Sequence, residues 1–240
     1  MVGVGPAALP MKKSPPASLS ARYERDGFVI LPDLLSAEEC DRLKVEARRV
    51  LDEHAKPGSS VHVHVAVVSP LYRALAFDPR IVRPLSAVMK HGVMFLSDKI
   101  VYKSADKKFP TPWHIDCFYW RNTRPKLSVW IPLDDATAEN GTLTVVPGSH
   151  KKNWNMIKMG LPSGDFQYEI NGTDWREGDV VTCAIKRGTG IIFSDRLVHG
   201  STANTAGRDR YAIISTYHAP AADEPFDLDL PARQVIIPAA

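Results

Sequence analysis

Along the first ninety residues, apolar side chains recur mainly at the three- and four-residue spacing of amphipathic helices. The clearest start is at Ser36, which can cap a helix while Glu39, three residues later, reaches back to the capping residue. Apolar residues continue at helical spacing, so the pattern predicts an amphipathic helix over Asp33–Leu51. Similar signals predict further helices beginning at Leu19 and over Leu71–Phe77 and Ile81–Met89, and a strand over Phe28–Leu31.

After Gly92 the pattern changes to short β-branched and aromatic runs separated by Gly, Pro, Asn and Asp. Turn-forming pairs such as Asn140-Gly141 lie between these runs, and the spacing leaves no room for crossover helices. We therefore expect a mostly β chain with a helical N-terminal third, in which a jelly-roll-like core is flanked by helices. The predicted strands are Val93–Lys103, His114–Trp120, Leu127–Leu133, Leu143–Pro147, Val180–Ile185, Ile191–Phe193 and Arg210–His218.

The composition is that of one globular domain. The chain has 240 residues, of which 44% are hydrophobic and 24% charged. Residues 1–18 are rich in proline, and the Lys12–Lys13 pair follows the apolar stretch, whereas a secretory signal has its basic residues first. We expect a flexible leader over residues 1–18 and a single domain over residues 19–240.

Charge and cysteine usage exclude several classes of partner. The 30 basic and 27 acidic residues form no long like-charge runs, so we expect no nucleic-acid partner. No uncharged apolar run reaches the length of about 18 residues that a membrane span needs. The three cysteines are widely spaced without a CxxC pair, which predicts neither a disulfide framework nor a thiolate zinc site. The expected protein is cytoplasmic, a monomer or homodimer, and binds a small molecule.

The clearest candidate chemistry is the segment Trp113-His114-Ile115-Asp116. Side chains two residues apart in a strand share a face, so His114 and Asp116 can bind one metal ion there. Two histidines and one carboxylate are the ligands of non-haem Fe(II) oxygenases, which keep coordination positions open for cosubstrate and oxygen. His199, at the end of another strand-rich stretch, is the candidate for the third ligand.

Arg210 and Ser201, which both follow His199 in the chain, could bind a cosubstrate that carries carboxylates. Arg210 opens a predicted strand, and its planar guanidinium fork can pair bidentately with the distal carboxylate of a 2-oxo diacid that chelates the metal. Ser201 could add a hydrogen bond. By contrast, we expect Arg208, in the turn just before Arg210, to face solvent.

Together with the stretches KLSVWIPLDDATAENGTLTVVPGSH and RYERDGFVILPDLLSAEECDRLK, these residues resemble the phytanoyl-CoA dioxygenase family, which includes ectoine hydroxylase-like enzymes. The resemblance covers roughly Tyr23 to Ala219. It implies a double-stranded β-helix (cupin-like jelly roll) with Fe(II), 2-oxoglutarate as cosubstrate and O₂. It also implies that Arg210 holds the distal carboxylate of the cosubstrate, with Ser201 beside it.

The resemblance extends to three further residues. It implies that Lys103 contacts the cosubstrate, although a solvated lysine at a strand end is the alternative. Trp120 occupies a position where the family often has an aromatic residue, and together with Tyr119 it could wall the substrate pocket. Both rings could instead belong to the core.

Other polar residues are interpreted as structural. His62 and His64 alternate in the run Ser60–Val68 and could share a strand face, but no glutamate follows at a ligand spacing, so half-exposed strand histidines are expected. A role near the substrate mouth is the alternative. Cys117 is expected to pack away from the metal.

The sequence thus predicts an Fe(II)- and 2-oxoglutarate-dependent dioxygenase that hydroxylates an unactivated C–H bond of a small metabolite and releases succinate and CO₂. Because Asp116 is present, the resemblance does not favour halogenation. Desaturation, epoxidation and ring closure share the same metal ligands and stay open. Two other functions are a metal- and 2-oxoglutarate-binding or sensing protein without turnover, and a zinc hydrolase built on the same three ligands.

Overall fold

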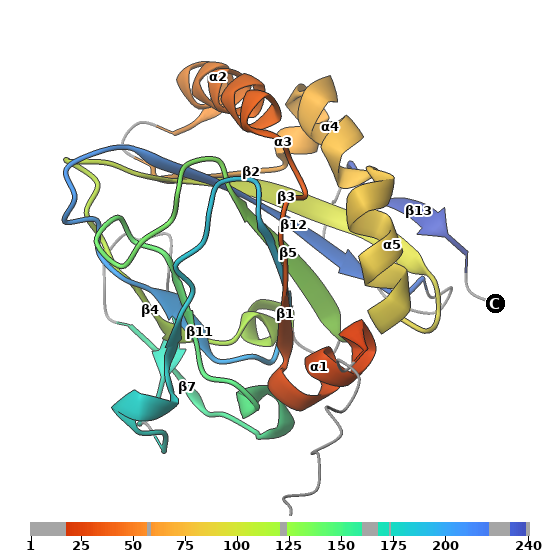
Figure 1. Ribbon diagram of the computed structural model, residues 1–240, viewed down its shortest axis with the longest axis vertical. Coiled ribbons are helices and arrows are strands. Elements are labelled where there is room, and N and C mark those ends of the chain that lie inside the picture. The colour runs from red at the N-terminus through yellow and green to blue at the C-terminus, as the bar shows by residue number, and fades with distance from the viewer. Residues whose placement is uncertain are drawn as a thin grey trace, which may run out of the picture.

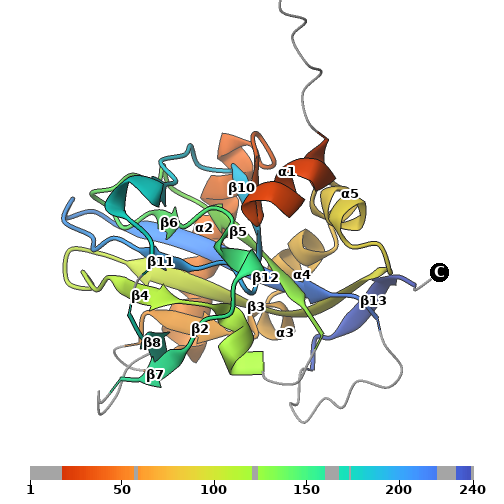
Figure 2. The same ribbon diagram turned by 90° about the horizontal axis from the view of Figure 1, so that it is seen from below.

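Two antiparallel sheets form the core of the molecule. The computed structural model describes residues 18–56, 59–120, 124–159, 168–172, 174–220 and 231–238. The larger sheet has the order β1-β10-β5-β12-β3-β13, with β2 also paired to β3, and the smaller has the order β4-β11-β6-β9. Helices cover the outer face of the larger sheet, and the smaller sheet lies on the opposite side (Figure 1, Figure 2). The predicted mostly β fold with a helical N-terminal third is confirmed.

The helices are α1 (Leu19–Asp26), α2 (Ala37–His54), α3 (Val65–Val68), α4 (Pro70–Ala76) and α5 (Pro79–Val88), and three 3₁₀ turns are η1 (Asp116–Trp120), η2 (Ser149–Lys151) and η3 (Glu177–Asp179). The first strands are β1 (Phe28–Leu31), β2 (Val61–Val63), β3 (Val93–Lys103), β4 (Thr111–His114), β5 (Lys126–Pro132) and β6 (Leu143–Val145). The remaining strands are β7 (Met156–Lys158), β8 (Tyr168–Ile170), β9 (Val181–Thr182), β10 (Gly190–Ser194), β11 (His199–Ser201), β12 (Arg210–His218) and β13 (Gln234–Ile237).

Ser36 is the N-cap of α2, as the capping signal in the sequence indicated. The Ser36 hydroxyl accepts the Glu39 amide, and the Glu39 carboxylate accepts the Ser36 amide. The helix nevertheless begins later than predicted, because Asp33 has a left-handed φ of 56° and the chain enters the helix through a turn. It also continues to His54, three residues beyond the predicted end.

The two faces of the larger sheet bury different sets of side chains. On the outer face, residues such as Phe95, Ile213 and Tyr217 pack against the helices, and the Tyr217 hydroxyl donates a hydrogen bond to the Ala76 carbonyl in α4. On the inner face, Trp130, together with other apolar residues of both sheets, forms a second cluster. Because side chains alternate along a strand, the polar residues of the inner face enter the space between the sheets.

Three strand predictions need correction. The strand predicted over His114–Trp120 ends at His114, because the Cys117 amide donates to the Asp195 carbonyl and the chain turns into η1. The run Ser60–Val68 is extended only to Val63, since His64 has a φ of 63° and starts α3. The strand predicted over Val180–Ile185 is limited to β9, and the β7–β8 hairpin and β13 were not predicted.

The N-terminal leader predicted for residues 1–18 lies outside the described residues, apart from Ser18, whose hydroxyl caps α1. Among the described residues, no helix is long and apolar enough to cross a membrane.

Candidate active site

Two histidines face each other from paired strands at one end of the smaller sheet. His114 on β4 and His199 on β11 are register partners. The His114 Nδ1 donates to the Pro112 carbonyl at 2.8 Å, and the His199 Nδ1 donates to the Leu197 carbonyl at 2.9 Å. A carbonyl can only accept, so both rings carry their proton on Nδ1 and present a lone pair on Nε2. Both Nε2 atoms are therefore ready to bind a metal.

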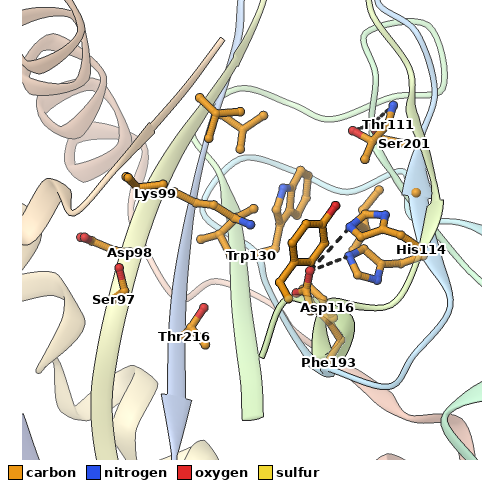
Figure 3. A pocket seen from close by; sticks show the side chains of 18 of the residues that line it. Ser97, Asp98, Lys99, Thr111, His114, Asp116, Trp130, Phe193, Ser201 and Thr216 are labelled. Carbon is orange, nitrogen blue, oxygen red and sulfur yellow. Dashed lines mark hydrogen bonds and ion pairs between the residues drawn. The ribbon is translucent and has the colours of Figure 1, made fainter. Parts of the chain in front are cut away.

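Asp116 completes this group from the first residue of η1. Its Oδ1 lies 3.5 Å from the His114 Nε2 and 3.8 Å from the His199 Nε2 (Figure 3). One ligand atom from each of the three residues lies within 4.8 Å of the others, and all three residues are buried. The Ser128 hydroxyl donates to the other carboxylate oxygen of Asp116 at 3.4 Å. The turn after β4, instead of a shared strand face, is what brings Asp116 beside His114.

The electrostatics favour the protonation states that bind a metal. Burial alone would raise the pKa of Asp116, but the neighbouring side chains of His199, His114 and Lys99 outweigh it, so this pKa lies well below its ordinary value. Burial, reinforced by His114, lowers the pKa of His199 to about 4. At neutral pH the carboxylate of Asp116 is ionised and the His199 ring is neutral, as a divalent metal requires.

Arg210 lies in the same cavity as the three residues, at the start of β12. It is buried, its Nη2 donates to the Gly141 carbonyl at 2.7 Å, and its guanidinium lies 5.7 Å from the centre of the Trp130 ring. The Nη1 atom has no hydrogen-bond partner among the described residues. Burial lowers the pKa of Arg210 to about 10, so the side chain stays charged at neutral pH. A buried cation with an unused donor fits an anionic ligand, as 2-oxoglutarate would supply.

Gly141 shapes this anion-binding end of the cavity. Its φ of 86° is a left-handed conformation that suits glycine. A Cβ at this position would come within 2.6 Å of the Lys103 side chain. The turn predicted at Asn140-Gly141 therefore packs closely on Lys103 while its carbonyl positions Arg210.

Lys103 and Ser201 lie beside Arg210. Lys103 is the register partner of Arg210 and is fully buried, so the alternative of a solvated strand-end lysine is wrong. Its Nζ donates to the Ser201 hydroxyl at 2.7 Å and to the Thr202 carbonyl at 2.6 Å. The Ser201 hydroxyl lines the cavity and donates to the Thr111 hydroxyl at 2.7 Å. Lys103 thus reaches the cavity through Ser201. Burial and the nearby Arg210 charge lower the pKa of Lys103 to about 7.

The cavity has a volume of about 360 Å³ and joins the metal-binding group to Arg210 and Ser201. Tyr119 lines it, as expected for a wall of the substrate pocket. The backbone of Trp120 ends η1, but its side chain lies outside the described residues. Arg208 is exposed, as predicted.

Two more polar residues line the cavity outside the iron and cosubstrate sites that the sequence predicted. Lys99, which the sequence analysis did not single out, lines the cavity from β3. Its signal was the even spacing from Lys103, which places both side chains on one face of the strand. His64 also lines the cavity, and its Nδ1 lies 3.1 Å from the Ser97 hydroxyl. His62 instead lies near His54, with ring centres 6.2 Å apart. The two histidines therefore do not form the strand-face pair that the alternating pattern suggested.

Comparisons with known proteins agree with this geometry. A family model described as phytanoyl-CoA dioxygenase (PhyH) matches residues 23–212. The ectoine dioxygenase of Sphingopyxis alaskensis is 26% identical over 249 residues, which cover 90% of this chain and 80% of that protein. The L-proline trans-4-hydroxylase of Streptomyces griseoviridis is 25% identical over 234 residues, covering 85% and 87%. The crystal structure of SnoN, a non-haem α-ketoglutarate-dependent epimerase from nogalamycin biosynthesis, has a TM-score of 0.67 at 25% identity and covers 92% of this chain and 94% of SnoN.

Two histidines and a carboxylate between the sheets of a double-stranded β-helix place the chain among the Fe(II)- and 2-oxoglutarate-dependent oxygenases. Within that class, the chain belongs to the phytanoyl-CoA dioxygenase family. It is a dioxygenase that acts on a small metabolite with Fe(II), 2-oxoglutarate and O₂. The resemblance drawn from the sequence is confirmed.

Replacing His199 with alanine removes a direct metal ligand. Loss of a group that only hydrogen-bonds to a ligand weakens metal binding by roughly 10–100-fold, so His199→Ala should weaken Mn(II) binding by more than this. The fold should survive, since the strands around His199 are held by backbone pairing. Calorimetric titration with Mn(II), with thermal unfolding of the metal-free protein, measures both effects. The exposed His91→Ala variant is the control and should bind normally. Retention of stoichiometric Mn(II) affinity by His199→Ala would exclude this residue as a ligand.

Proposed function

We propose that the protein hydroxylates a C–H bond of a small metabolite. In this reaction substrate, 2-oxoglutarate and O₂ yield the alcohol, succinate and CO₂. The observation that carries the proposal is the single cavity in which three metal-binding side chains and a buried arginine with an unused donor lie together. Such a cavity can hold the metal and both ends of the cosubstrate at once.

His114 and His199 would hold the iron through Nε2, and Asp116 through a carboxylate oxygen. When bound, Fe(II) chelated by 2-oxoglutarate supplies the activation of O₂ and the oxidation of the substrate. The chain itself fixes the ligands. Each histidine ring is oriented by the backbone carbonyl two residues before it, and Asp116 receives a hydrogen bond from Ser128. These contacts restrict the side-chain conformations of the three ligands before metal binds, so less conformational entropy is lost on binding.

Arg210 would bind the distal carboxylate of 2-oxoglutarate through its free Nη1, while Nη2 stays on Gly141. Ser201 would donate to the same carboxylate after releasing Thr111, and Lys103 would act through Ser201. Tyr119 and Trp120 would wall the substrate side. Because water competes with every charged contact, the burial of Arg210 strengthens its pairing with the cosubstrate.

The alternatives explain less of the structure. A zinc hydrolase built on the three ligands has no use for a buried arginine in the same cavity. A binding or sensing protein without turnover would use Arg210, so only turnover separates it from an enzyme. Hydroxylation is preferred over other oxidative outcomes because a hydroxylase is among the relatives, although SnoN is an epimerase.

We also propose a single domain over residues 19–240 in the cytoplasm. Strand β1 near the start and β13 near the end belong to the same sheet, which supports one domain. All three cysteines are free thiols, and Cys40 and Cys183 are buried, which is usual in a reducing compartment.

Succinate formation tests the proposed function without knowledge of the substrate. The protein with Fe(II), ascorbate and air should release succinate from 2-oxoglutarate slowly, and Asp116→Ala should not. Zn(II) in place of Fe(II) should give no succinate. Absence of Fe(II)-dependent succinate, with 2-oxoglutarate still bound, would favour the binding or sensing function.

Arg210→Ala should raise the dissociation constant for 2-oxoglutarate by about thirty-fold or more, because losing a buried charged partner costs on the order of 2–5 kcal/mol. Mn(II) affinity should change much less. Lysine should restore binding only in part, since an ammonium cannot hold the Gly141 carbonyl and the carboxylate at once in the planar geometry of the guanidinium. Calorimetry on the Mn(II)-loaded protein measures both constants. The exposed Arg208→Ala variant is the matched control, and a large effect there with none at Arg210 would overturn the assignment.

The affinity for 2-oxoglutarate should fall as the pH rises through about 7. The pKa of Lys103 is lowered to about 7, so the side chain loses its proton near this pH. A 2-oxoglutarate dianion bound beside Arg210 stabilises the charged form of Lys103. The protein with Lys103 protonated therefore binds 2-oxoglutarate more tightly. Binding by the Mn(II)-loaded protein between pH 6 and pH 8.5 should weaken several-fold for wild type. Lys103→Met should bind weakly at both ends of this range. The same pH dependence in Lys103→Met would show that another group is responsible.

A further inference from the structure

The part of the cavity away from Arg210 contains a second cation. Lys99 extends from β3 into the cavity, toward the metal-binding group (Figure 3). It lies opposite Ile214 in the register of β3 and β12, four residues along from the pair of Lys103 with Arg210. At about 3.4 Å per residue, this places the Lys99 backbone about 14 Å from that pair. Lys99 is thus outside the site proposed for the distal carboxylate.

Lys99 makes no hydrogen bond or ion pair with any residue in the described part of the chain. Asp98, its neighbour, does not neutralise it, because the Asp98 carboxylate points to the helix side of β3 and accepts the Ala66 amide (Figure 3). Asp116 is close enough for Lys99 to lower its pKa, but its oxygens face the two histidines and Ser128.

Charge balance assigns Lys99 to a ligand other than the cosubstrate. Fe(II), Arg210 and a protonated Lys103 together bring four positive charges, and Asp116 with the 2-oxoglutarate dianion brings three negative ones. That half of the cavity therefore has no negative charge left over to pair with Lys99. Lys99 is partly buried and is left as a cation without a paired anion in the cavity, so it is available to a second anionic ligand.

The surroundings of Lys99 indicate the remainder of that ligand. Val61 and Val63 of β2 line this end of the cavity together with Ile214, and Thr216 contributes a hydroxyl. Val63 is half exposed and so lies at the mouth. His64 and Ser97 also line this end, but they contact each other at 3.1 Å. A single ammonium with apolar neighbours and few further polar groups suits one carboxylate on a small, mainly apolar body. It suits a phosphate less, since phosphate sites usually gather several donors.

We propose that Lys99 binds a carboxylate of the substrate, so that the substrate is a small organic or amino acid held between Lys99 and the metal. This inference rests on the proposed function and adds the class of substrate to it. Lys99 would fix the orientation of the substrate and therefore which C–H bond faces the metal. It is a specificity-determining residue and takes no part in holding the metal.

The first test asks whether Lys99 serves the cosubstrate instead. Calorimetry on the Zn(II)-loaded protein compares 2-oxoglutarate binding in wild type, Lys99→Met and Lys90→Met, whose lysine is exposed. Lys99→Met should weaken binding by no more than about threefold, the effect of losing a neighbouring charge without a direct contact. A larger loss, absent from Lys90→Met, would assign Lys99 to a carboxylate of 2-oxoglutarate and overturn the proposal. Failure of wild type to bind 2-oxoglutarate would speak against the proposed function instead.

The second test observes Lys99 directly. Reductive methylation with ¹³C-formaldehyde keeps the charge of each lysine and gives it an NMR signal, and Lys99→Arg identifies the signal of Lys99. In the protein loaded with Zn(II) and 2-oxoglutarate, butyrate should shift this signal saturably, whereas butyramide, which has the same shape without the charge, should not. The Lys90 signal should respond to neither. No response to butyrate, or equal responses to both probes, would overturn the proposal.

Discussion

The pairing of β3 with β12 determines which side chains enter the cavity. The two strands pair from Arg210 opposite Lys103 to His218 opposite Met94. In this register Lys99, Lys103 and Arg210 share the inner face, while Phe95 and Tyr217 pack under the helices. A slip of one residue would turn the cations toward the helices and the aromatic rings toward the metal. The apolar contacts on the outer face therefore hold the polar inner face in place.

Buried charge is the cost of this arrangement. Without ligands, the inner face of β3 and β12 carries three basic side chains, against the single carboxylate of Asp116. The protein reduces this cost in two ways. Arg210 and Lys103 donate to backbone carbonyls, and the pKa of Lys103 is low enough for partial deprotonation at neutral pH. Anionic ligands remove the rest of the imbalance, so the empty cavity is organised to bind them.

Much of this was predictable from the sequence, and the reasons differ between residues. The helix at Ser36 and the strand at Val93–Lys103 follow from local signals, and the structure has both. The group of His114, Asp116 and His199 could be proposed because their residue types and order resemble a family. The turn after His114 could not, since it depends on a hydrogen bond to Asp195, far away in the chain. Lys99 was missed for a related reason: the role of a lysine in a strand cannot be assigned until the residues on the opposite wall of the cavity are known.

The central claim is that one cavity holds Fe(II) and 2-oxoglutarate together, on His114, Asp116, His199 and Arg210. An anaerobic titration tests it most directly, because 2-oxoglutarate chelating Fe(II) gives a charge-transfer absorption band in the visible spectrum. The account predicts that the Fe(II)-loaded protein develops this band as 2-oxoglutarate is added, with saturation at one equivalent per chain. Binding of both Fe(II) and 2-oxoglutarate without the band would mean that they occupy separate sites, and would contradict the account.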